Sequence, residues 1–127
     1  MNENMILNFE NNEVKIINNE GKPLFEIYST GMALGHIKFA KGKAYPRKDR
    51  IDKTIKSIEI STVVLMEQQY MNLENLKRFI SIAHTEKKID FIMWLKEKGF
   101  ISYDEVFNII TKETIFIKEL ENALKNF

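Results

Sequence analysis

The chain has 127 residues, a length typical of one domain, and its 44% hydrophobic and 29% charged residues are typical of a folded protein and exclude wholesale disorder. It has no cysteine, which excludes disulfides, thiol catalysis and every zinc site that needs sulfur. The formal net charge is +1, but residues 38–56 carry 8 basic and 2 acidic side chains, so this segment has a charge of +6 and the remainder −5.

The first third of the chain has the pattern of three strands followed by a short helix. Short runs of apolar and β-branched residues predict strands at residues 5–9, 14–17 and 24–27. Asn11-Asn12 is the expected turn between the first two. Ser29 or Thr30 can then cap a short helix, which Gly35 would end because glycine tolerates a left-handed backbone.

Basic side chains gather in the segment that follows. They are Lys38, Lys41, Lys43, Arg47, Lys48, Arg50, Lys53 and Lys56. With Phe39 and Tyr45 between them, they are expected to form an exposed loop that leads into a short helix over residues 49–57. A solvated connection is one interpretation of this segment. Binding of a polyanion is the other, and the two arginines favour it because a guanidinium fork matches phosphates and guanine edges.

The second half of the chain is predicted to be mainly helical, after one β-type run at residues 63–66. From Asn72, the expected N-cap, apolar residues recur with the helical period of 3.6. A second helix, capped by Thr85 and ended by Gly99, is apolar almost all the way round at residues 91–95, which predicts that it passes through the core. Together the elements predict an α+β fold: a small antiparallel sheet of short strands packed with helices, followed by a helical C-terminal half.

The last predicted helix has an unusually wide apolar face. Ser102 and Glu105 have the spacing of a capping box, and Thr111 is the expected cap of the helix that follows. Its apolar face consists of Phe116, Ile117, Leu120, Ala123, Leu124 and Phe127. This face either folds back on its own domain or forms a homodimer interface through Phe116, Ile117, Leu120, Leu124 and Phe127.

The sequence has no pattern that indicates catalysis. His36 and His84 lack the i+3 or i+4 partner expected of a helical metal pair, and no phosphate-binding loop is present. Glu13-Val-Lys15 matches half of a nuclease site, but such triplets arise by chance in charged proteins. We therefore expect a protein that is not an enzyme and that has neither a metal site nor a cofactor.

Four ordered blocks of sequence resemble a known family. They lie at residues 21–35, which end in Ala-Leu-Gly, at 42–53, at 59–64, and at 70–80 together with 91–95. The chain resembles the Bro-N module of phage antirepressors and baculovirus repeat-ORF proteins over about residues 5–98. It departs from that family after residue 95, where Lys-Glu-Lys-Gly-Phe replaces the usual Val-Leu-Pro and basic tail. The resemblance implies a Bro-N-like α+β domain at residues 1–99 and a helical extension at 100–127.

The resemblance also implies a function in DNA binding. It points to a non-enzymatic phage or prophage regulator of the antirepressor type, and within the basic segment it implies DNA binding by Lys41, Lys43, Arg47, Lys48, Arg50 and Lys53. The charge of the segment adds Lys38 and Lys56 to the expected binding residues. The alternative is a phage inhibitor that binds a host protein, either a repressor or a defence nuclease such as a CRISPR effector. No apolar run reaches the roughly 18 residues of a membrane span, and the N-terminus lacks the features of a signal peptide. We expect no membrane association and a location in the cytoplasm of the bacterial host cell.

Overall fold

The computed structural model describes residues 2–83 and 86–109, and the predicted α+β class is confirmed. The strands of the larger sheet are β1 (Asn2–Phe9), β2 (Asn12–Asn19), β3 (Lys22–Glu26), β6 (Val63–Leu65) and β7 (Gln68–Asn72). A second sheet consists of β4 (Ile37–Ala40) and β5 (Lys43–Pro46). The helices are α1 (Ile27–Ala33), α2 (Lys48–Ser57), α3 (Leu73–Ser81) and α4 (Lys88–Glu97), and residues 103–109 are also α-helical. The chain divides into two compact units, Met1–Phe91 and Ile92–Phe127.

The larger sheet is antiparallel throughout, with the strand order β1-β2-β3-β7-β6. Its first three strands were expected from the sequence, whereas β7 was not. Residues paired across an antiparallel ladder project from the same face, so the pairs of Phe25 with Ile16 and with Met71 place three apolar side chains together. All three are at most 1% exposed. They belong to the core of the first unit, against which Leu76 and Phe79 of α3 are also fully buried.

The turn between β1 and β2 lies one residue earlier than expected. Phe9 pairs with Asn12, which leaves Glu10 and Asn11 as the two-residue loop. Glu10 has a φ of 53°, in the left-handed region that such tight hairpin loops require. The predicted turn at Asn11-Asn12 is therefore wrong by one position, because β2 already begins at Asn12.

Helix α1 begins at Ile27, two or three residues before the expected caps Ser29 and Thr30. The cap is instead the buried carboxylate of Glu26, which accepts hydrogen bonds from the amide nitrogens of Tyr28 at 2.8 Å and Ser29 at 2.7 Å. A negative charge at this end of the helix is also favoured by the helix dipole. The expected caps at Ser29 and Thr30 are wrong because the apolar run at the end of β3 continues into the first turn of the helix.

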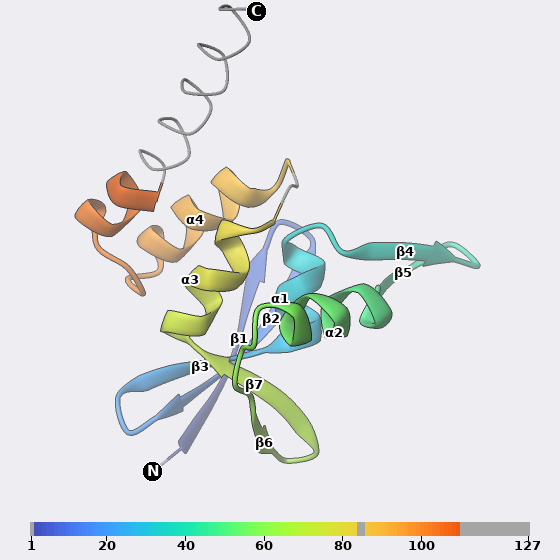
Figure 1. The fold of residues 1–127 in the computed structure, drawn as a ribbon, viewed down its shortest axis with the longest axis horizontal. Coiled ribbons are helices and arrows are strands. Elements are labelled where there is room, and N and C mark those ends of the chain that lie inside the picture. The colour runs from blue at the N-terminus through green and yellow to red at the C-terminus, as the bar shows by residue number, and fades with distance from the viewer. Residues whose placement is uncertain (1, 84–85, 110–127) are drawn as a thin grey trace, which may run out of the picture. The chain divides into compact units, whose positions relative to one another are not determined.

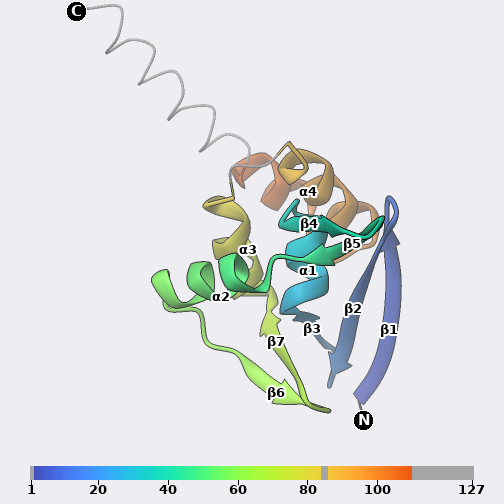
Figure 2. The ribbon, with the colours of Figure 1, turned by 90° about the vertical axis from the view of Figure 1, so that its right-hand side faces the viewer.

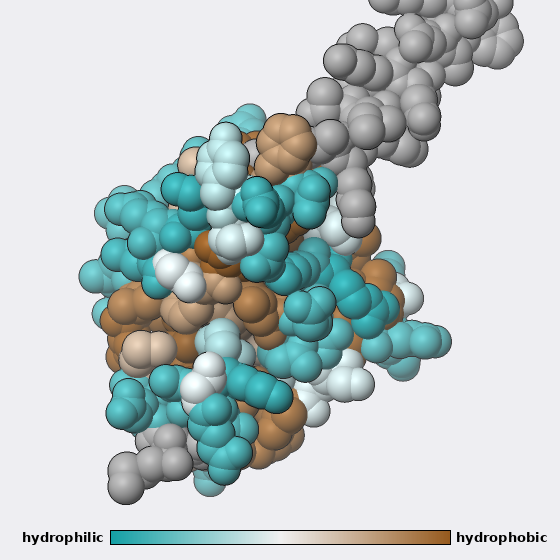
Figure 3. Space-filling view, turned by 90° about the vertical axis from the view of Figure 1, so that its left-hand side faces the viewer, coloured by the Kyte–Doolittle hydropathy of each residue, from teal (hydrophilic) through white to brown (hydrophobic). Residues whose placement is uncertain are grey.

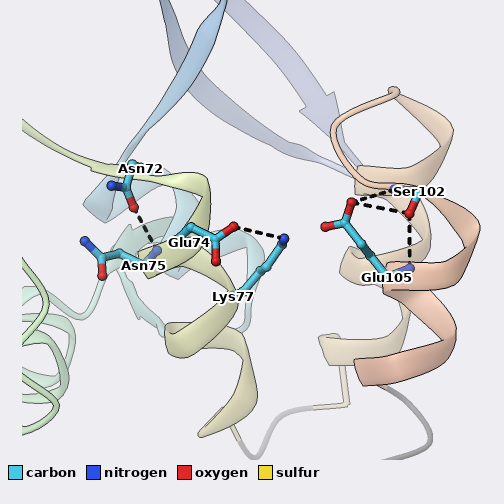
Figure 4. Close-up of polar contacts among 6 residues, drawn as sticks. All are labelled: Asn72, Glu74, Asn75, Lys77, Ser102 and Glu105. Atoms are coloured by element: carbon cyan, nitrogen blue, oxygen red, sulfur yellow. Dashed lines mark hydrogen bonds and ion pairs between the residues drawn. The ribbon is translucent and has the colours of Figure 1, made fainter.

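Two other helix starts were predicted correctly, as Figure 4 shows. The side-chain oxygen of Asn72 accepts a hydrogen bond from the Asn75 amide at 2.8 Å. Ser102 and Glu105 form the expected capping box, in which the Glu105 amide donates to Ser102 Oγ at 3.2 Å and the Ser102 amide donates to Glu105 Oε1 at 3.3 Å. Gly99 follows α4 with a φ of 84°, as expected of a glycine that ends a helix.

Apolar residues of α4 are buried as well. Trp94 is 7% exposed, which confirms that its side chain is buried, and Ile92 and Leu95 are buried with it. Met93 is 44% exposed, so the expectation that residues 91–95 are enclosed on every side is wrong at this position. The Trp94 and Phe100 rings lie 6.4 Å apart, centre to centre.

Some predictions fall outside the described residues. They concern His84, the caps Thr85 and Thr111, and the apolar face with its expected interface residues Phe116, Ile117, Leu120, Leu124 and Phe127. Within the described residues, no helix has the length and hydropathy needed to cross a bilayer.

Figure 3 looks at the side turned away from the β4–β5 hairpin, where hydrophilic side chains border a band of apolar surface.

Candidate nucleic-acid interface

The basic segment forms a hairpin and a helix. Strands β4 and β5 pair in antiparallel register. Figure 1 shows the hairpin projecting from the body of the first unit, and Figure 2 shows it from its projecting side, in front of α1. Its loop is the pair Lys41 and Gly42, with φ values of 52° and 77°, as a tight two-residue hairpin requires. The sequence predicted an exposed loop here instead of two strands, and this prediction was wrong. Both strands are largely exposed, so they lack the apolar alternation by which a half-buried strand is recognised.

The two faces of the hairpin differ in chemistry. The cross-strand pair of Lys38 and Tyr45 lies on one face, and the pair of Phe39 and Ala44 lies on the other. Both rings are accessible: Phe39 is 79% exposed and Tyr45 is 42% exposed. The hairpin therefore offers cations and two accessible aromatic rings on a ribbon two strands wide.

The base of the hairpin is held by backbone hydrogen bonds and by an aromatic contact. The His36 amide donates to the carbonyl of Gly31 in α1, and the Arg47 amide donates to the carbonyl of His36, each at 2.9 Å. The rings of His36 and of Phe79 in α3 meet in a T-shaped contact with their centres 5.7 Å apart. These contacts connect the start of β4 and the end of β5 to two helices of the first unit.

Helix α2 lies close against α1 because residue 31 has no side chain. A Cβ atom at Gly31 would lie 2.4 Å from Cδ1 of the fully buried Ile51, which is far inside van der Waals contact. Beside this contact, Tyr28 Oη donates a hydrogen bond to Asp52 Oδ1 at 2.8 Å. The ammonium group of Lys48 lies over the Tyr28 ring, 5.0 Å from its centre. The helix thus has a defined position beside the hairpin.

The predicted binding residues share this hairpin and helix, but they do not share one face. Lys38, Lys41 and Lys43 lie on the hairpin, Arg47 precedes α2, and Lys48, Arg50, Lys53 and Lys56 lie on α2. All are exposed except Arg47, which is half-buried. Because Ile51 and Ile55 face inward, helical spacing places Lys53 on the outer side of α2, Lys48 on one flank and Arg50 on the other.

A groove of about 1240 Å³ lies along the hairpin and the start of α2. Its lining includes the basic residues Lys15, Lys38, Arg47 and Lys48 and the aromatic residues Tyr28, Phe39 and Tyr45. The carboxylates of Glu13, Glu26 and Asp49 line it too. Lys15, Tyr28 and Glu26 were not predicted as site residues, since only the pairing of distant segments brings them to the basic segment.

The pKa values of two groups are shifted by their surroundings. Burial raises the pKa of Tyr28 to about 12, with further contributions from its hydrogen bond to Asp52 and from the charges of Asp52 and Glu26. Tyr28 therefore stays protonated and remains the donor to Asp52 at neutral pH. Partial burial lowers the pKa of His36, and the positive charges of Arg50 and Arg47 lower it further.

The His36 shift predicts how stability changes with pH. The ordinary histidine pKa is 6.5, and the folded protein has a lower one. As pH falls below 6.5 the unfolded chain therefore takes up a proton before the folded chain, so stability present above this pH is lost as pH falls through the folded pKa. Urea unfolding between about pH 7.5 and 5.5 should show this loss, and a His36→Gln variant should show a smaller one. An equal loss in both proteins would contradict the assignment.

The described residues do not gather a metal site. Among them, no group of three or more His, Asp or Glu side chains is arranged to hold an ion. Glu13 and Lys15 of the nuclease-like triplet both line the groove.

A comparison of the chain with protein-family models, curated proteins and solved structures finds no match.

Proposed function

We propose that this chain is a phage or prophage regulator of the Bro-N type, which acts in the bacterial cytoplasm and binds duplex DNA through the β4–β5 hairpin and α2. The observation that carries the proposal is the position of the cations: seven lysines and arginines lie on one two-stranded ribbon and the helix that follows it, and Arg47 lies between the two. A ribbon of two strands and an α-helix are the two elements that fit the major groove of B-DNA. The Bro-N resemblance of the sequence supports the same function.

The contacts of the interface support distinct roles for its basic residues. Exposed lysines on a projecting hairpin can follow the phosphate backbone without a fixed geometry. Arg47 and Arg50 carry planar forks, which suit bidentate contacts to phosphate or guanine. We assign phosphate contacts to the lysines, and contacts that include base edges to the two arginines.

The dependence of binding on salt tests the proposal. Each phosphate contact contributes about 0.9 to the negative slope of log affinity against log salt. If about six of the eight cations contact phosphates, affinity for a short duplex should fall roughly a thousandfold between about 50 and 200 mM salt. Fluorescence anisotropy with a labelled duplex measures the affinity at each salt concentration and hence the slope. A slope near zero, or no binding at low salt, would contradict DNA binding by this surface.

The alternative is inhibition of a host repressor or defence nuclease through protein contacts. Exposed apolar side chains at the edge of the larger sheet favour it, since Val63, Val64 and Met66 are 48%, 66% and 63% exposed. In that case a purified partner should bind with a defined stoichiometry and with little dependence on salt, whereas the chain alone should not bind duplex DNA. The salt titration thus separates the two functions.

A further inference from the structure

Phe39 is the most exposed large apolar side chain among the described residues, at 79%. It lies in β4, two positions before the Lys41-Gly42 loop that ends the hairpin. Its cross-strand partner is Ala44, whose single methyl group is too small to cover a phenyl ring. The hairpin itself therefore gives this ring no shelter from water.

Exposed lysines lie next to this ring along the ribbon, although Lys38 and Lys43 project from the opposite face. Lys38 precedes it, and Lys41 and Lys43 follow it in the loop and in β5, all three being exposed. A partner that complements this surface must present negative charge at its exterior and an apolar layer just behind. Duplex DNA does so, because its phosphates lie outside its stacked bases. An anionic bilayer does so too, but insertion into a bilayer is typical of broad apolar faces rather than of a single ring on a narrow ribbon.

We propose that Phe39 inserts between adjacent base pairs when the hairpin lies against duplex DNA, and that it opens this step and bends the duplex. Apolar side chains act as such wedges in several proteins that bend DNA. Lys41, in the loop two positions from Phe39, lies where it can contact a phosphate beside the opened step. This inference rests on the proposed DNA binding and adds a preference for deformable sites.

The test compares an intact duplex with the same duplex carrying a one-nucleotide gap. A gap removes part of the unstacking cost, so a wedge should favour the gapped duplex by roughly tenfold. Phe39→Ala should bind both duplexes equally while its salt slope stays that of the parent. Phe107→Ala is the matched control, since Phe107 is 60% exposed and lies outside the hairpin, and it should keep the preference. Energy transfer between dyes at the duplex ends should report a bend with the parent and the control, and a smaller bend with Phe39→Ala.

The outcomes separate this inference from the proposed function. If the parent binds neither duplex, both fail. If the parent binds both equally, or if Phe39→Ala keeps the preference and the bend, the wedge is refuted and DNA binding stands. If Phe39→Ala changes only binding to phosphatidylserine vesicles, the ring contacts a membrane and the inference is wrong. The exposed position of Phe39 predicts an unchanged melting temperature for the variant, which circular dichroism checks.

Discussion

Replacing Arg47, Lys48 and Arg50 together by alanine is expected to weaken duplex binding and to flatten its salt dependence. Each lost phosphate contact should lower the slope of log affinity against log salt by about 0.9, so the triple variant should lose about one unit through Lys48, and up to about 2.7 units where both arginines also contact phosphates. Anisotropy titrations at several salt concentrations measure the change. The loss of affinity should be largest at low salt, where counterion release contributes most.

A matched control separates local contacts from net charge. Lys22, Lys96 and Lys98 lie outside residues 38–56, and their replacement by alanine removes the same three charges. This control should keep most of the affinity and the slope of the parent. If both triple variants lose binding equally, the protein attracts DNA only by its overall charge, and the assignment to the basic segment is wrong.

Phe79→Ala is expected to cost about 3–5 kcal/mol of the free energy of unfolding. The ring is fully buried in the first unit, and its removal leaves a cavity next to the fully buried side chains of that core. Small domains are stable by only about 5–15 kcal/mol, so the variant should be marginally folded. Urea denaturation measures the loss, and an equally large but exposed ring, in Phe107→Ala, should change stability by less than about 0.5 kcal/mol.

This substitution should also affect the interface. Phe79 supports the His36 ring at the base of the hairpin, so any folded Phe79→Ala protein should hold the hairpin less firmly and bind DNA more weakly than its folded fraction explains. If Phe79→Ala lowers the free energy of unfolding by less than about 1 kcal/mol, the Phe79 ring does not pack in the core as described. Normal affinity per folded molecule would show that His36 anchors the hairpin without Phe79.

Much of the fold could be predicted where local chemistry decides the structure. The strands before residue 28 were recognised by apolar runs and turn residues, and Asn72 and Ser102 were recognised as caps because a helix start requires an acceptor at that position. Glu26 was missed, because glutamate is not among the preferred N-cap residues, whereas the serine and threonine that follow closely are. Strand β7 was missed since Gln68-Gln69-Tyr70 pairs with its neighbours through backbone groups and has no marked apolar alternation.

The candidate site could be predicted in composition but not in geometry. The basic residues were visible as a local excess of charge, while the hairpin that carries three of them has little burial and so left no hydrophobic pattern. The groove depends on Lys15 and Tyr28, which only the folded chain brings beside residues 38–49. The roles of Gly31 and Ile51 likewise depend on two helices touching, a relation that no local pattern encodes.

The close approach of α1 and α2 at Gly31 has a consequence for the thermodynamics of binding. Because α2 is fixed against α1, and the hairpin is tied to His36 and Arg47 at its base, the backbone positions that carry the cations are set before any partner arrives. Association then has to order side chains but not backbone. The entropic cost is about 0.5–1.5 kcal/mol for each side chain that becomes immobile. Calorimetry should accordingly find a heat-capacity change far smaller than that of a segment that folds as it binds, in which about 1,000–3,000 Å² becomes buried.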